Sequence, residues 1–218
     1  LNRDYPECWT FNVDGLFGAT PELLIRRTAD QVTSRVLAGT IRRSANSDRD
    51  GQLAHELFES DKAQEEHAYA VDSVASALAR HCTDLQVPQE PFILRLANVQ
   101  HLATDINGSL VDSTTALALA AALHPTAAVC GTPTERALGL IEQLEGNNRG
   151  RYAGPVGWID AKQNGELGIA LRCAHIEDAE QQQLRLFAGC GIVAGSTVES
   201  EVAESDAKFA AIANLFTA

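Results

Sequence analysis

Hydrophobic and polar positions follow strand-like patterns in the first part of the chain. Two apolar segments, Trp9–Val13 and Leu16–Ala19, flank Asp14-Gly15, a dipeptide typical of a tight hairpin turn. The segment Gln31–Leu37 alternates and is rich in β-branched residues, which favours another strand. These patterns predict a hairpin followed by a further strand.

Helical spacing of apolar residues begins at Gln52 and continues to Leu78, without Gly or Pro. We expect a break near Ser60-Asp61, with Asp61 capping the second helix. The polar stretch Arg42–Gly51 before it predicts an exposed loop. Further helices are predicted at Ser113–Leu123, at Pro133–Leu144 with Thr132 as its cap, and from about Glu199 to Leu215.

The remaining apolar runs predict strands at Phe92–Leu96, Gln100–Ile106, Tyr152–Asp160, Leu167–Ala174 and Leu184–Val193. Short polar gaps separate the last three, which favours antiparallel neighbours over helical crossovers. Strands and helices come in blocks without a regular βαβα alternation. The pattern therefore predicts an α+β fold in a single domain over residues 1–218.

Composition narrows the class of protein. The chain has 218 residues, 45% of them hydrophobic, which suffices for a core and argues against intrinsic disorder. A net charge of −12 argues against nucleic-acid binding, because nucleic acid would be repelled. Neither a membrane-length apolar run nor a signal peptide is present in the sequence given, so no membrane partner is expected.

The cysteines indicate a reducing compartment. They are five in number, widely spaced and without a C-x-x-C pair, so the spacing typical of zinc sites is absent. Cys130, Cys173 and Cys190 lie in apolar runs and are expected to be buried hydrophobes. We therefore expect a cytoplasmic protein.

Acidic residues on two predicted helices could hold a cation. Glu201, Glu204 and Lys208 stand at i, i+3 and i+7, on one helix face, while Glu66 lies on a separate helix. Carboxylates from two helices suit a hard cation such as Mg²⁺, which keeps several waters and prefers oxygen ligands. From spacing alone, solvated surface carboxylates are the more common explanation.

Other polar positions carry less specific signals. Arg172 lies within an apolar run predicted as a strand, where it would form either a structural ion pair or a clamp for an anionic ligand. Glycines at Gly189, Gly191 and Gly39 could let the backbone approach a ligand, although turns and tight sheet packing are the more common explanation. His101 alone is more typical of a structural histidine. Neither a nucleotide-binding motif nor a Ser-His-Asp or Cys-His arrangement is found.

Eight segments occur in an order that resembles a known family. They are Gly18–Leu24, Leu37–Thr40, Glu66-His67, His101–Thr104, His124–Thr126, Tyr152–Trp158, Ile169–Ala174 and Phe187–Val193. The chain resembles the chorismate-utilising enzymes: isochorismate synthase, anthranilate synthase component I, aminodeoxychorismate synthase and salicylate synthase. Val156–Asp160 and Leu171–Ala174 resemble isochorismate synthases most, whereas Ala38 and Gly131–Thr134 depart from the aminodeoxychorismate and anthranilate patterns, respectively.

The resemblance implies a fold of two facing antiparallel β-sheets flanked by helices. It also implies that chorismate is the substrate and that Mg²⁺ is the cofactor, with Glu66 and Glu204 as ligands. Glu201 would hold a metal-bound water, and Lys208 would lie near the ring carboxylate. This cation would offset the charge of the substrate.

The same resemblance assigns the rest of the site. Arg172 would bind the enolpyruvyl carboxylate beside Tyr152, Gly189 and Gly191. His101, Gly39 and Thr40 would line the ring site. Glu22 would be the general acid for the departing C4 hydroxyl and would need a raised pKa. The implied reaction adds water at C2, releases the C4 hydroxyl and gives isochorismate.

One departure affects the expected activity. The family's water-activating Lys lies upstream of the segment that contains Glu22, and no Lys precedes Lys62 here. We therefore expect a C-terminal part that lacks N-terminal strands, is weakly active or inactive alone, and can self-associate through exposed sheet edges. The alternatives are an anthranilate or salicylate synthase, a non-catalytic chorismate-binding domain, and an α+β domain without this chemistry.

Overall fold

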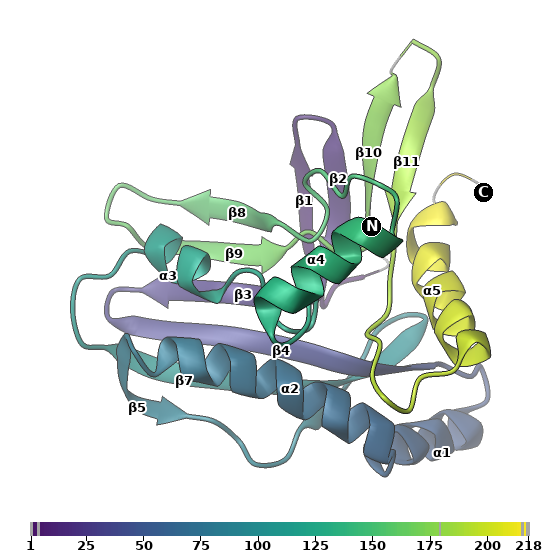
Figure 1. Cartoon of the computed structure of the whole chain (residues 1–218), viewed down its shortest axis with the longest axis horizontal. Coiled ribbons are helices and arrows are strands. Elements are labelled where there is room, and N and C mark those ends of the chain that lie inside the picture. The colour runs from purple at the N-terminus through teal and green to yellow at the C-terminus, as the bar shows by residue number, and fades with distance from the viewer. Residues whose placement is uncertain (1, 4, 179, 215, 217–218) are drawn as a thin grey trace.

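The chain forms two antiparallel sheets with five helices in the described residues (Figure 1). The computed structural model describes residues 2–3, 5–178, 180–214 and 216. The smaller sheet has four strands in the order β1-β2-β10-β11. Their bounds are Trp9–Val13 (β1), Leu16–Thr20 (β2), Cys173–Asp178 (β10) and Gln183–Phe187 (β11).

The larger sheet has seven strands, six of them in the order β5-β7-β4-β3-β9-β8, with β6 paired to β7. All of its pairs are antiparallel, and the longest pairing joins β4 to β7. The strands are Leu23–Thr28 (β3), Gln31–Arg42 (β4), Cys82–Gln86 (β5), Phe92–Arg95 (β6), Val99–Leu110 (β7), Pro155–Ile159 (β8) and Gly165–Ile169 (β9).

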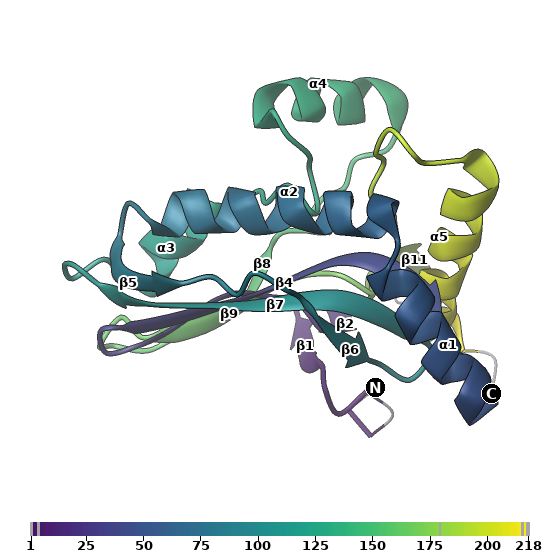
Figure 2. The same ribbon diagram turned by 90° about the horizontal axis from the view of Figure 1, so that it is seen from below.

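Two helices, α2 (Asp61–Leu78) and α3 (Ala116–Leu123), lie along one face of the larger sheet (Figure 2). The other helices in the described residues are α1 (Ser47–Phe58), α4 (Thr134–Leu144) and α5 (Val198–Ala213). The main core forms where α2 places Val74 and Leu78 against Val32 and Val36 of β4, because the apolar stripe of α2 repeats at helical spacing. α4 stands away from the sheets and buries none of its residues. Within the described residues, none of the helices combines the length and apolar character of a membrane span.

The predicted α+β class, the two antiparallel sheets and the flanking helices are confirmed. The first hairpin turns at Asp14 and Gly15, with φ of 46° and 76°. Both values lie in the left-handed region that a two-residue turn of this kind requires. The sequence pattern missed β3 and β5, which are short strands.

Three local predictions need correction. Part of the predicted loop Arg42–Gly51 is helical, because Asn46 accepts a hydrogen bond from the Arg49 amide and starts α1 at Ser47. Ser60, not Asp61, caps α2. The residue before α4 is Pro133, without a side-chain cap, so Thr132 is not the cap. The end predicted for the last helix, Leu215, lies outside the described residues.

The chain crosses between the two sheets at two neighbouring places. The predicted strand Leu167–Ala174 is wrong as a single element, because β9 ends at Ile169 and β10 starts in the other sheet at Cys173. The β2–β3 connection makes the same crossing through Pro21 and Glu22. A hydrogen bond of 3.2 Å from the Ile169 amide to the Glu22 carbonyl joins the two crossings. Both crossings therefore bring residues to one junction.

Gly18 permits the close approach of strands at this junction. A Cβ there would lie 2.7 Å from the Arg172 carbonyl oxygen and 2.7 Å from the Cys173 Cβ. We expect Gly18→Ala to lower the free energy of unfolding by roughly 1–3 kcal/mol, as overpacking does. Gly51→Ala is the control: it lies in α1 with nothing within 4 Å of the added Cβ, so it should stabilise by about 0.5–1 kcal/mol. Urea unfolding of both variants tests this, and equal effects would contradict it.

Candidate functional site

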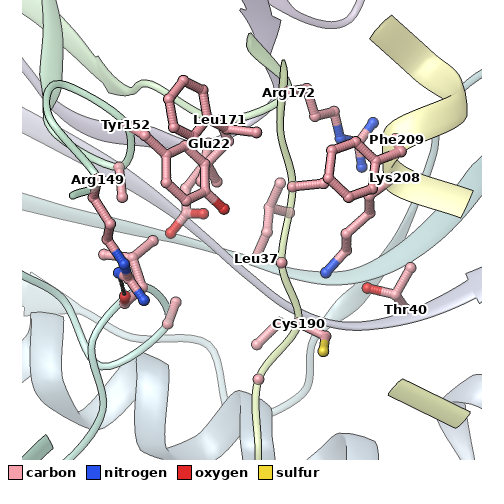
Figure 3. A pocket seen from close by; sticks show the side chains of 18 of the residues that line it. Glu22, Leu37, Thr40, Arg149, Tyr152, Leu171, Arg172, Cys190, Lys208 and Phe209 are labelled. Carbon is pink, nitrogen blue, oxygen red and sulfur yellow. Dashed lines mark hydrogen bonds between the residues drawn. The ribbon is translucent and has the colours of Figure 1, made fainter. Parts of the chain in front are cut away.

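A cavity of about 680 Å³ opens at the junction of the two sheets, between β4, β7, the β11–α5 loop and α5. Figure 3 shows side chains from several of these elements pointing into it. Ten residues singled out from the sequence line it: Glu22, Gly39, Thr40, Glu66, His101, Tyr152, Arg172, Gly189, Gly191 and Lys208. Glu201 and Glu204 do not line the cavity. Glu204 forms an ion pair with Lys208, which does line it.

Arg172 is a buried cation with unused donor capacity. It is 6% exposed and has a φ of 47°, a value rare outside glycine and often found at functional sites. One terminal nitrogen, Nη2, donates to Nε2 of His101. The other, Nη1, is buried without a hydrogen-bond partner, and the described residues place no carboxylate in an ion pair with it. The structural ion pair considered from sequence is therefore absent there, and the guanidinium can still bind an anion.

His101 connects Arg172 to a bulge of β4 at Gly39, where the pairing with β7 shifts register. Because a guanidinium only donates, Nε2 accepts and the proton of the neutral ring is assigned to Nδ1. Nδ1 lies 3.2 Å from the Gly39 carbonyl oxygen and 3.1 Å from the Thr40 hydroxyl. Burial and then the charge of Arg172 hold the pKa of His101 well below its ordinary value. His101 is therefore a neutral support for Arg172.

Glu22 is a buried carboxyl at the other sheet crossing. It is 4% exposed, and its amide donates to the Thr20 hydroxyl over 3.3 Å. Burial raises the pKa of Glu22 to about 8, although the charges of Lys208 and Arg172 oppose the shift. The raised pKa expected for this residue is thus present in the structure. At neutral pH most Glu22 side chains carry a proton that can be donated.

Two carboxylates, Glu66 of α2 and Glu204 of α5, repel one another electrostatically. Burial raises the pKa of Glu66, and the charge of Glu204 raises it further. The Glu204 carboxylate accepts a hydrogen bond of 2.6 Å from Lys208, one turn further along α5. The loop after β11 packs on Glu66 so tightly that a Cβ at Gly191 would lie 2.3 Å from its Oε1. A negative pair is thus held close to the cavity.

The third acidic residue, Glu201, points to Lys62 of α2 and forms an ion pair with it through Oε1. Its Oε2 is buried without a hydrogen-bond partner. The described residues contain no group of three or more His, Cys, Asp and Glu arranged to hold a metal ion. The fit to a cation therefore rests on Glu66 and Glu204, a like-charged oxygen pair that Mg²⁺ could bind while keeping waters.

Aromatic side chains form another wall of the cavity. Tyr152 stacks on Phe187, with ring centroids 5.1 Å apart and an interplanar angle of 12°. The Arg149 guanidinium lies 5.9 Å from the centre of the Tyr152 ring. Burial raises the pKa of Tyr152 to about 12, so the phenol keeps its proton and can donate to a ligand.

Several lining or supporting residues were not identified from the sequence. Arg149, Arg185 and Phe209 line the cavity, and Lys62 pairs with a predicted metal residue. The four-residue spacing of Lys62 and Glu66 on a helix was the available signal for Lys62. Cys173 is buried as expected, but Cys130 and Cys190 are only half-buried, and Cys190 lines the cavity. Its apolar run extends past β11 into the loop that faces the cavity.

Comparison with known proteins places this geometry in context. A family model described as chorismate binding enzyme matches residues 1–217. Isochorismate synthase DhbC of Bacillus subtilis (strain 168) is 48% identical over 89% of this chain and 48% of its own length. The crystal structure of DhbC from Bacillus anthracis has a TM-score of 0.89 at 40% identity, over 95% of this chain and 56% of that one.

The menaquinone-specific isochorismate synthase MenF of Escherichia coli is also similar in structure. Its TM-score is 0.86 at 33% identity, over 98% of this chain and 50% of that one. The chain thus spans about half the length of the relatives it matches.

Proposed function

Because the chain belongs to the family of chorismate-binding enzymes, we propose that it forms the chorismate and Mg²⁺ site of an isochorismate synthase. The observation that carries this proposal is the unpartnered Nη1 of buried Arg172 in the cavity wall. An empty donor on a buried cation favours a carboxylate ligand, and chorismate has two carboxylates. Isochorismate synthases among the relatives favour this branch of the family.

Charged groups of opposite sign meet at the proposed cation site. Glu66, Glu201 and Glu204 lie there with Lys62 and Lys208. Arg149, Arg172 and Arg185 line the cavity. A dianionic substrate and a divalent cation carry opposite charges, so each should favour binding of the other.

The proposed reaction assigns steps to particular groups. Arg172 binds the enolpyruvyl carboxylate, with Tyr152 beside it, while Glu66 and Glu204 would hold the cation. The cation, when bound, would offset the charge of the ring carboxylate. A water oxygen forms the bond to C2, the ring double bond shifts, and the C4–O bond breaks. Glu22 protonates the departing C4 hydroxyl, and a base takes a proton from the attacking water.

Removing either cation carboxylate should weaken substrate binding. We expect Glu66→Gln and Glu204→Gln each to lower chorismate affinity in 5 mM MgCl₂ by roughly tenfold or more, because the cation is then held less well. Glu65→Gln, on the exposed side of the same helix turn, should leave affinity unchanged. Calorimetric titration of chorismate, with and without Mg²⁺, measures these affinities. Equal losses of chorismate affinity in all three variants, or a chorismate affinity that is the same with and without Mg²⁺, would contradict the proposed site.

Product identity tests the assignment to the isochorismate branch. The chain is incubated with chorismate, Mg²⁺ and an ammonium salt, and the products are separated by chromatography. We expect any product to be isochorismate, without incorporated nitrogen. Anthranilate would place the chain in another branch, and salicylate would indicate a further pyruvate-eliminating step.

A further inference from the structure

Lys62 of α2 lies beside an acidic cluster formed by Glu66, Glu201 and Glu204. It lies in the first turn of α2, four residues before Glu66, so both side chains share a helix face. Its ammonium donates to Oε1 of Glu201 on α5, 139 residues away in sequence. The charges of Glu201, Glu204 and Glu66 all act on it. Lys62 is therefore paired with Glu201 and lies within the electrostatic reach of Glu66 and Glu204.

The surroundings shield Glu201 from solvent and leave Lys62 partly exposed. The side chain of Glu201 is 9% exposed and that of Lys62 28% exposed. A Cβ at Gly195, in the loop after β11, would lie 3.5 Å from Lys62 Cγ, so this loop packs along the lysine stem. Glu201 Oε2 remains buried and without a hydrogen-bond donor. Both Lys62 and the Ser200 hydroxyl donate to Oε1 of Glu201, so only Oε2 is left open for another positive ligand.

From this arrangement we propose that Lys62 competes with the divalent cation for Glu201 and thereby sets the cation affinity of the site. This inference rests on the proposed cation site. Without a cation, Lys62 neutralises Glu201. A cation at Glu66 and Glu204 repels the ammonium and attracts the Glu201 carboxylate, directly or through water. Loading the cation therefore requires Lys62 to give up part of its ion pair.

The competition predicts a gain of affinity when Lys62 is removed. Lys62→Met keeps the apolar stem and removes the charge, so we expect it to bind Mg²⁺ roughly tenfold more tightly than the unchanged chain. Lys162→Met, in the turn between β8 and β9, is the control and should bind as the unchanged chain does. Calorimetric titration with MgCl₂ and no substrate measures all three affinities.

A second readout separates this inference from the proposed function. In EDTA, Lys62→Met should melt at a lower temperature than the unchanged chain, because Glu201 is buried without its counter-ion. Saturating Mg²⁺ should reduce the difference in melting temperature between the two proteins. If the chain and Lys62→Met bind Mg²⁺ with equal affinity, or the variant binds less tightly, the inference is overturned while the cation site stands. If neither binds Mg²⁺, the cation site itself is wrong and the competition falls with it.

Discussion

Replacing Arg172 by methionine is expected to weaken chorismate binding by about a hundredfold or more. The guanidinium is buried and its Nη1 has no hydrogen-bond partner among the described residues, so a substrate carboxylate would supply the missing acceptor. Losing one partner of a buried charge pair costs about 2–5 kcal/mol, because the other charge is then desolvated without compensation. Methionine retains most of the apolar length, which limits damage to the fold.

Two further variants make this result specific. Arg172→Lys keeps the charge but loses the planar pair of donors, so it should recover only part of the affinity. Arg80→Met, at an exposed position after α2, should bind chorismate normally. Calorimetry at fixed Mg²⁺ gives the affinities, and circular dichroism checks that each variant is folded. Full affinity in a folded Arg172→Met would show that the anion binds elsewhere.

Replacing Glu22 by glutamine is expected to remove a large pH dependence of stability. Burial raises the pKa of Glu22 from 4.5 to about 8 in the folded chain. Between these two values the folded state binds more protons than the unfolded state, so stability falls as pH rises. At 1.36 kcal/mol per pH unit, the loss is about 3 kcal/mol at pH 7 and about 5 kcal/mol above pH 8. Glutamine stays neutral and avoids this loss.

Urea unfolding at pH 5 and pH 8.5 measures the effect. Glu22→Gln should differ little from the unchanged chain at pH 5 and be more stable by several kcal/mol at pH 8.5. Glu65→Gln, whose side chain is exposed, should follow the pH dependence of the unchanged chain. Parallel pH dependences for Glu22→Gln and the unchanged chain would mean that Glu22 is ionised in the folded state. A carboxylate of that kind could not act as the proposed general acid.

The sequence predicted the helices and hairpins well where local spacing determines them. The apolar period of α2, its break at Ser60 and the Asp14-Gly15 turn all follow from local geometry. Exact caps were less predictable, because Ser60 and Asp61 are both suitable N-cap residues. In the structure, the Ser60 side chain accepts a hydrogen bond from the Ala63 amide and is the cap.

The crossing at Arg172 could not be read from the pattern. Residues 167–174 form one apolar run, yet the chain leaves one sheet at Ile169 and joins the other at Cys173. The positive φ of Arg172 cannot be predicted from the spacing of hydrophobic residues. The resemblance assigned Arg172 to an anion, but only the structure shows that its Nη1 has no hydrogen-bond partner among the described residues. The contact of Lys62 with Glu201 is hidden for a similar reason, since tertiary packing across 139 residues creates it.

The most direct test of the account is a calorimetric titration of chorismate into this chain, with MgCl₂ and again with EDTA. The account predicts saturable binding of one chorismate per chain with MgCl₂ and much weaker binding in EDTA. Arg172→Met should weaken chorismate binding by about a hundredfold or more with MgCl₂. A folded chain that binds no chorismate in the presence of Mg²⁺ would contradict the central claim that this cavity is a chorismate and cation site.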